Sequence, residues 1–139
     1  MEDSRVIMYH KQGYSARTLF LRLNDTVCYP KALPSLSQVG ENHIEEGQKV
    51  SYPSTLIADT EKQLGLSSGM LEIEGEFEAE VDAPEHPIHV YLARFTTIDP
   101  PYEQLENSAG KFIALTDARS LPPAELELLR RAYSFLMED

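Results

Sequence analysis

Three polar residues at helical spacing could do chemistry in this sequence. Asp59, Lys62 and Gln63 stand at positions i, i+3 and i+4, which share one face of an α-helix. The carboxylate of Asp59 is the kind of hard oxygen ligand that Mg²⁺ prefers. The ammonium of Lys62 suits a phosphate group and repels a metal ion. The formal charges of the three side chains sum to zero, so this face predicts weak metal binding at best. Glu61, two residues after Asp59, is expected to point away from that face.

The helix that must carry these residues has recognisable ends. Pro53 suits a first helical position, and Gly65 is placed to terminate the helix after about Leu64. Within it, Leu56, Ile57, Thr60 and Leu64 share a second face, which we expect to pack on a sheet.

The rest of the chain supplies strands and one more helix. The runs "RVIMYHK" and "RTLFLRL" predict a hairpin, "IHVYLARFT" a long central strand and "KFIAL" a short one. Alternation in "MLEIEGEFEAEV" predicts a half-buried strand or hairpin bent near Gly75. The proline-rich "TIDPPYEQLENSAG" predicts a loop. "AELELLRRAYSFLME" predicts an amphipathic helix whose inward residues are Leu126, Leu129, Ala132, Tyr133 and Leu136. This order predicts an α+β sandwich.

Composition excludes several classes of function. The chain has 139 residues, 42% of them hydrophobic, and a formal net charge of -11, which disfavours binding to a nucleic acid polymer through a broad basic face. Its one cysteine, Cys28, excludes an internal disulfide and favours a small buried side chain over a nucleophile. No apolar run approaches the ~20 residues of a membrane span, and the N-terminus is unlike a secretory signal. We expect a cytoplasmic protein, and a homodimer stays open.

Two motifs carry a resemblance to a known family. "NHIEEGQ" resembles G-H-I-E-E-G-E, and "ADTEKQLGL" resembles R-E-L-x-E-E-L-G-L; these are the opening and the close of the Nudix box. The strands before and after the box, with "KFIALTDARSLP" near the end, extend the resemblance over nearly the whole chain. It implies a single Nudix-like domain over residues 1–139, an α/β/α sandwich with a mixed sheet.

The same comparison shows where the sequence departs from the box. Asp59 stands where the family has its first metal-ligand glutamate, and Lys62 and Gln63 stand where it has the paired glutamates that complete a magnesium site. The spacer before the helix is two residues longer than the family's. Other box positions also differ: Asn42 for glycine, Gln48 for glutamate and Ala58 for arginine. We therefore expect magnesium to bind weakly, with Asp59 as the metal ligand that remains.

Further carboxylates could complete the site. Glu46 precedes the helix and is a candidate ligand-binding residue together with Lys62 and Gln63. Glu103 and Glu106 lie in the later loop from which Nudix enzymes often take a ligand or a general base, so both join Asp59 as candidate catalytic residues. The alternative is that these acids only solvate loops in a chain with 23 Asp+Glu.

Three functions follow. The first is a Nudix-fold protein with a cleft for a nucleoside-diphosphate-type ligand and weak or absent pyrophosphohydrolase activity. The second is an active magnesium-dependent pyrophosphohydrolase that uses Asp59 with loop glutamates. The third is a non-catalytic protein-interaction domain. The identity of Lys62 favours the first over the second, because an ammonium belongs beside a phosphate rather than a metal.

Overall fold

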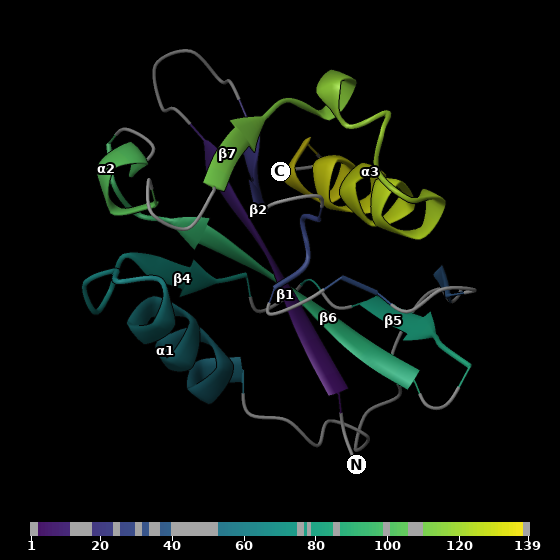
Figure 1. Ribbon diagram of the computed structural model, residues 1–139, viewed down its shortest axis with the longest axis horizontal. Helices are drawn as coiled ribbons and strands as arrows, with labels where there is room; N and C mark the ends of the chain where they lie inside the picture. Colours follow the sequence, from purple (N-terminus) through teal and green to yellow (C-terminus); the bar gives the residue numbers. More distant parts are fainter. Residues whose placement is uncertain are drawn as a thin grey trace.

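A computed structural model describes residues 3–11, 18–23, 26–29, 32–33, 37–39, 53–74, 77, 79–84, 87–98, 101–105 and 110–137. The helices of this part are α1 (Pro53–Gln63), α2 (Tyr102–Leu105), the 3-10 helix η2 (Leu115–Asp117) and α3 (Pro123–Met137). The strands are β1 (Asp3–Lys11), β2 (Thr18–Leu23), β3 (Gln38–Val39), β4 (Leu71–Ile73), β5 (Ala79–Asp82), β6 (Pro87–Phe95) and β7 (Gly110–Ile113) (Figure 1). None of the helices in these ranges is long and apolar enough to cross a membrane.

A mixed sheet organises the described strands. Its order is β3-β5-β6-β1-β2-β7, and β4 also pairs with β6. β1 and β6 run parallel over a register from Asp3↔Ile88 to Tyr9↔Arg94. The other pairs are antiparallel, including the predicted β1–β2 hairpin with Tyr9 opposite Phe20.

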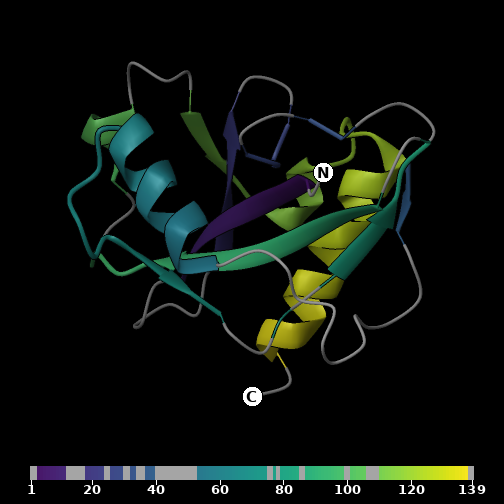
Figure 2. The same ribbon diagram turned by 90° about the horizontal axis from the view of Figure 1, so that it is seen from below.

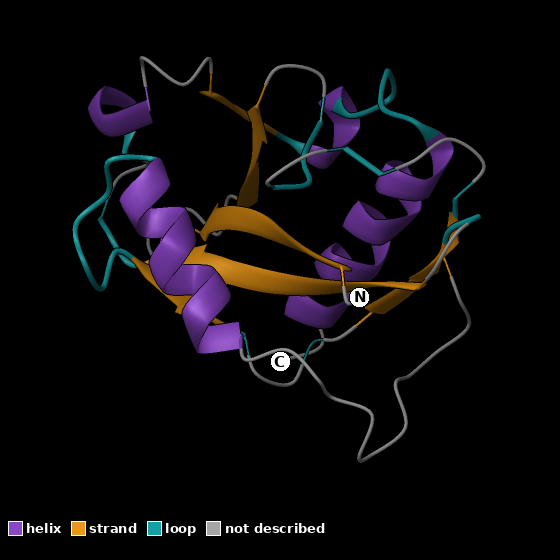
Figure 3. Cartoon of the chain, turned by 60° about the horizontal axis from the view of Figure 1, so that its bottom comes forward, coloured by secondary structure: helices purple, strands orange, loops and turns teal. Residues whose placement is uncertain are grey.

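The two long helices cover opposite faces of this sheet, as Figures 2 and 3 show from two further directions. Side chains alternate along a strand, so each strand contributes to two cores. On one side, Ile57 of α1 and Leu64, which directly follows the helix, pack with residues of the central strands that include Val6, Met8 and Tyr91. On the other, the buried face of α3 packs against the alternate residues of the same strands; its members are Leu128, Leu129, Ala132 and Leu136. The α+β sandwich predicted from the sequence is confirmed.

Three details differ from the sequence-based expectations. The "MLEIEGEFEAEV" run forms two strands, β4 and β5, that each pair with β6 and not with each other. The proline-rich loop contains a short helix, α2, whose Leu105 is buried in the α1-side core. Tyr133 was expected to face inward but is 37% exposed, because α3 turns Leu129, Ala132 and Leu136 toward the sheet.

The burial of α3 predicts which of its residues stabilise the fold. Leu129→Ala should lower the free energy of unfolding by about 2–5 kcal/mol, since Leu129 is fully buried and its loss leaves a cavity. Tyr133→Ala should cost less than about 1 kcal/mol, the usual range for a surface site. Urea denaturation followed by circular dichroism measures both. Equal losses for the two variants would contradict the orientation of α3.

Candidate functional site

Helix α1 ends in a defined hydrogen-bonded cap directly after Gln63. Gly65 has a φ of +74°, a left-handed conformation that glycine adopts without steric cost. Its N–H donates to the Lys62 carbonyl at 3.3 Å, and the Leu66 N–H donates to the Glu61 carbonyl at 2.8 Å. This pair of bonds is the Schellman arrangement, which satisfies the last carbonyls of a helix. The predicted role of Gly65 is confirmed.

The exposed side of this last turn carries the three residues singled out in the sequence. Asp59, Lys62 and Gln63 are all exposed, while Ile57 and Thr60 of the same helix are buried. We call the first three the α1 polar face. Within the part of the chain that the structure describes, neither Asp59 nor Lys62 makes an ion pair or a side-chain hydrogen bond. The ammonium of Lys62 is therefore available to an anion.

Gln63 is tethered by a residue far away in the sequence. The Tyr29 hydroxyl donates a hydrogen bond of 2.7 Å to Gln63 Oε1. Burial raises the pKa of the Tyr29 phenol, which keeps it protonated as a donor. The Tyr29 backbone is fixed beside β1 by two bonds exchanged with Val6, of 2.9 and 3.0 Å. Sequence reasoning missed Tyr29, because no local pattern links it to α1.

Helix α3 supports the segment that presents Tyr29. Glu125, on the buried face of α3, accepts a hydrogen bond from the Thr26 hydroxyl at 2.7 Å and one from the Val27 N–H at 3.1 Å. The Thr26 hydroxyl oxygen in turn accepts the Cys28 N–H at 3.0 Å. The Cys28 side chain is 1% exposed, and burial, followed by the charge of Glu125, raises the pKa of its thiol. A protonated, buried thiol is a packing group rather than a nucleophile.

Glu61 has a structural task on the side of α1 away from the polar face. Its side chain is buried, and Oε2 accepts two backbone hydrogen bonds, from Gly69 N at 2.9 Å and from Leu71 N at 3.0 Å. A carboxylate in the last turn of a helix opposes the helix dipole, so these two donors offset an unfavourable position. Glu61 thereby fixes the turn that leads from α1 into β4.

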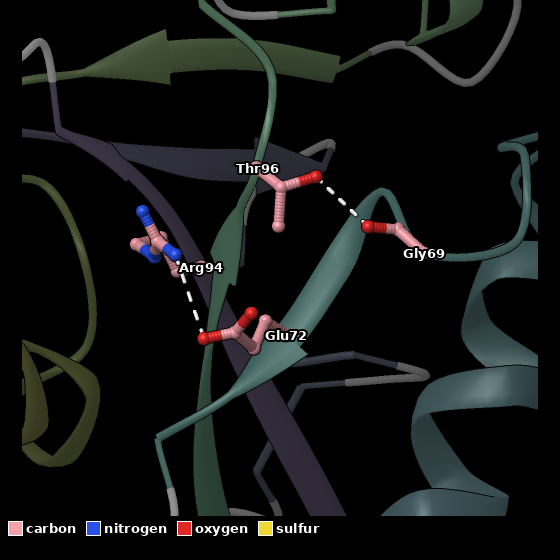
Figure 4. A network of polar contacts seen from close by, with 4 residues as sticks. All are labelled: Gly69, Glu72, Arg94 and Thr96. Carbon is pink, nitrogen blue, oxygen red and sulfur yellow. Dashed lines mark hydrogen bonds and ion pairs between the residues drawn. The ribbon is translucent and has the colours of Figure 1, made fainter.

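The same turn holds the end of β6, as Figure 4 shows. The Thr96 hydroxyl donates to the Gly69 carbonyl at 2.8 Å, and the Thr96 N–H donates to the Met70 carbonyl at 2.9 Å. Next to it, Arg94 of β6 and Glu72 of β4 form an exposed ion pair of 3.4 Å. The start of the segment that leads to α2 is therefore tied to the exit of α1.

The structure describes some of the candidate acids and not others. Glu103 is exposed on α2, and the burial of Leu105 with Ile57 and Leu64 places α2 on the same side of the sheet as α1. Asp59 and Glu103 thus both belong to elements of that side. Glu46 and Glu106 lie outside the described residues, so their proposed roles stay predictions.

The described residues do not fit a standard magnesium site. Among them, no group of three or more His, Cys, Asp or Glu side chains could hold a metal ion. The α1 polar face offers one carboxylate, a cation and an amide oxygen already bonded to Tyr29. Magnesium requires near-octahedral oxygen ligands and offsetting negative charge, which this set does not supply.

Together these elements define a class of fold. A mixed sheet between α1, with its exposed polar face, and α3 is the architecture of the Nudix hydrolases, and the resemblance noted in the sequence is confirmed at the level of the fold. The chain matches the crystal structure of C. elegans Ap4A hydrolase with a TM-score of 0.58, over 98% of this chain and 99% of that chain. The two sequences are 20% identical, so the match establishes the fold alone. No protein-family model and no curated protein matches the sequence.

The bonds of Glu61 predict a distinction between two substitutions. Glu61→Ala should lower the free energy of unfolding by about 1–3 kcal/mol or more, because it leaves two backbone donors without an acceptor. Glu61→Gln should cost clearly less, since an amide oxygen can accept both bonds that now meet at one oxygen atom. Hydrogen exchange should accelerate at Gly69 and Leu71 in the Ala variant.

A matched control is Glu127→Ala, which removes a carboxylate from a surface pair with Arg131. Such pairs contribute little to stability. If Glu61→Ala is no more destabilising than Glu127→Ala, the two bonds to the turn do not stabilise the fold.

Proposed function

We propose that this protein binds a nucleoside-diphosphate-type ligand at the α1 polar face and hydrolyses it weakly or not at all. The observation that carries the proposal is Lys62, exposed on the last turn of α1 without an ion-pair partner in the described residues. In the Nudix box, this position belongs to a glutamate that binds magnesium beside the substrate's phosphates. A fixed ammonium there takes over part of the electrostatic task of the metal.

Binding and hydrolysis make different demands on this face. The Lys62 ammonium can donate charge-assisted hydrogen bonds to phosphate oxygens without any metal. The Tyr29–Gln63 bond keeps the adjacent amide in one orientation, which leaves its NH₂ group as a further donor. Hydrolysis needs more, because an ammonium neither generates hydroxide nor clamps a leaving group as a metal ion does. The residues therefore favour a binding protein over an efficient hydrolase.

The relative of known structure suggests which ligands to try. That protein is an Ap4A hydrolase, and Ap4A contains the diphosphate linkage that the α1 polar face is proposed to contact. A panel of Ap4A, ADP and a sugar diphosphate, each titrated with and without magnesium, separates the functions. Chelator-resistant binding without turnover supports the proposal. Magnesium-dependent turnover lost in Asp59→Asn and Glu103→Gln supports an active hydrolase, and no binding at all supports an interaction domain.

Lys62→Ala tests the proposed contact directly. With excess chelator, it should weaken binding of the diphosphate ligand roughly ten- to hundredfold, the loss expected for one charge-assisted bond. Isothermal titration measures the affinity. Arg130→Ala removes one positive charge from the exposed face of α3, on the other side of the sheet, and should leave binding unchanged. Unchanged affinity in Lys62→Ala would exclude Lys62 from the site.

Restoring the box carboxylates should restore metal binding. Lys62→Glu combined with Gln63→Glu places two acids at i+3 and i+4 from Asp59, so magnesium should bind at least tenfold more tightly than to the native chain. Titration with Mn²⁺, followed by its electron paramagnetic resonance signal, reports the change. Adding Asp59→Asn to the double variant should reverse the gain. Tight metal binding by the native chain that survives Asp59→Asn would place the metal site elsewhere.

A further inference from the structure

Cations of several strands lie on the α3 side of the sheet, together with the acid Glu72 of β4. Phe20 of β2 and Ile113 of β7 belong to the core on the α3 side, and side chains two positions along each strand point to the same side. By this alternation, cations of four neighbouring strands share the α3 side: Arg5, Lys11, Arg22, Arg94 and Lys111. Such a concentration is unexpected in a chain with a net charge of -11.

Two of these cations face each other directly. Arg22 and Lys111 are register partners in the antiparallel β2–β7 pair. Side chains at directly opposed positions have Cβ atoms about 4.5–5.5 Å apart, and like charges there repel. Lys111 is exposed, Arg22 is half-buried, and neither makes an ion pair or a side-chain hydrogen bond in the part of the chain that the structure describes.

Arg22 also has a donor without an acceptor. Its Nε is buried and has no hydrogen-bond partner among the residues that the structure describes. A buried unsatisfied donor costs free energy and is uncommon in native proteins. An oxyanion bound between the guanidinium and the ammonium would accept a hydrogen bond from Nε. The same anion would neutralise the repulsion between the two cations.

Arg94 of β6, on the same side of the sheet, is by contrast paired with an acid. Arg94 stands opposite Glu72 of β4 in register and forms an ion pair with it at 3.4 Å. At the β2–β7 pair, the position opposite Arg22 holds Lys111 in place of an acid. This strand pair therefore offers the two cations no counter-charge of its own.

We propose that Arg22 and Lys111 form a binding site for a phosphate group on the α3 side of the sheet, distinct from the α1 polar face on the other side. The planar fork of an arginine matches the oxygen geometry of phosphate, and lysine adds a point charge that adapts to it. The site recognises the phosphate group itself, whether free or attached to a larger molecule.

The test is titration of the native chain with inorganic phosphate in low-salt buffer with excess chelator, and with AMP as a second probe. Two or three charge-assisted bonds correspond to a dissociation constant of about millimolar or below. Phosphate binding with weaker AMP binding indicates a site for the free anion, and equal or tighter AMP binding indicates a phosphate carried on a ligand. No binding of either probe up to roughly ten times that concentration overturns the proposal.

Variants locate the site. Lys111→Gln, at an exposed position that tolerates substitution, should weaken phosphate binding at least tenfold, and Arg22→Gln should do the same. Arg94→Gln removes a paired cation from the same face and is the matched control. The tenfold loss caused by Lys111→Gln should also appear when Lys62→Ala is already present, which separates this site from the proposed diphosphate site. An equal loss in Arg94→Gln and in Lys111→Gln, or no further loss from Lys111→Gln when Lys62→Ala is already present, would overturn the assignment.

A spectroscopic signature tests the contact at the atom that motivates it. In ¹H–¹⁵N spectra, the Arg22 Nε–H resonance, assigned by its absence in Arg22→Gln, should shift as phosphate is added. The same titration of Lys111→Gln should need at least tenfold more phosphate for the same shift. A resonance that stays fixed while phosphate binds would show that the anion occupies another site.

Discussion

Strand β6 is the constraint on which the rest of the structure depends. One edge pairs in parallel with β1 over seven register positions, and the other edge pairs with two strands in succession. β5 occupies the first half of that edge, from Pro87 to Val90, and β4 occupies the second half, from Ala93 to Phe95. A parallel pair requires a long crossover connection, and the segment between β1 and β6, which includes α1, forms that connection. The exit of α1 is then fixed against the end of β6 through the 69–71 turn.

This arrangement explains why the alternating run predicted strands but not the strand with which each of them pairs. Alternation in "MLEIEGEFEAEV" correctly indicated strands with one buried face, but it carries no information on the partner. A hairpin would have paired the two halves with each other. Instead, both halves run antiparallel to β6 along a single edge, and the Glu74 N–H donates to the Leu92 carbonyl where the first half ends. The two halves pair with β6 rather than with each other because β6 is long enough to accommodate both strands along one edge.

Whether a feature could be predicted depends on how far apart in the sequence its interacting residues lie. The bounds of α1, its polar face and its glycine cap rest on residues within four or five positions of one another, and the sequence contains all of that information. The hydrogen bonds that orient the α1 polar face join residues far apart in the sequence. Tyr29 and Gln63 are separated by 34 positions, and Glu125 and Val27 by 98. Tyr133 shows a different limit. A helical stripe is about 100° wide, and a residue at its margin faces inward or outward according to how the whole helix is rotated.

Helix α1 therefore divides its surface among three tasks. One face contributes to the core, and Glu61 fixes the outgoing turn. The third face holds Asp59, Lys62 and Gln63, and among the described residues its side-chain hydrogen bond is the one from Tyr29 to Gln63. The division matters for function because a residue that stabilises the fold cannot be replaced freely, whereas the third face can change its chemistry without affecting the fold. Lysine and glutamine at positions 62 and 63 are compatible with the fold for this reason.

The net charge of -11 sets the condition under which such a face can attract an anion. A strongly acidic protein repels phosphates at long range, and at physiological salt this repulsion is screened beyond about 8 Å. Attraction must then come from cations within contact distance that are not already neutralised by the abundant acids. Arg94 and Arg131 fail this criterion because Glu72 and Glu127 pair with them. Lys62 and the Arg22–Lys111 pair meet it, on opposite sides of one sheet. Raising the salt concentration would weaken both the long-range repulsion and the contact attraction, but the buried Nε of Arg22 is screened less than the exposed Lys62. Anion binding at Arg22 should therefore be the less salt-sensitive of the two.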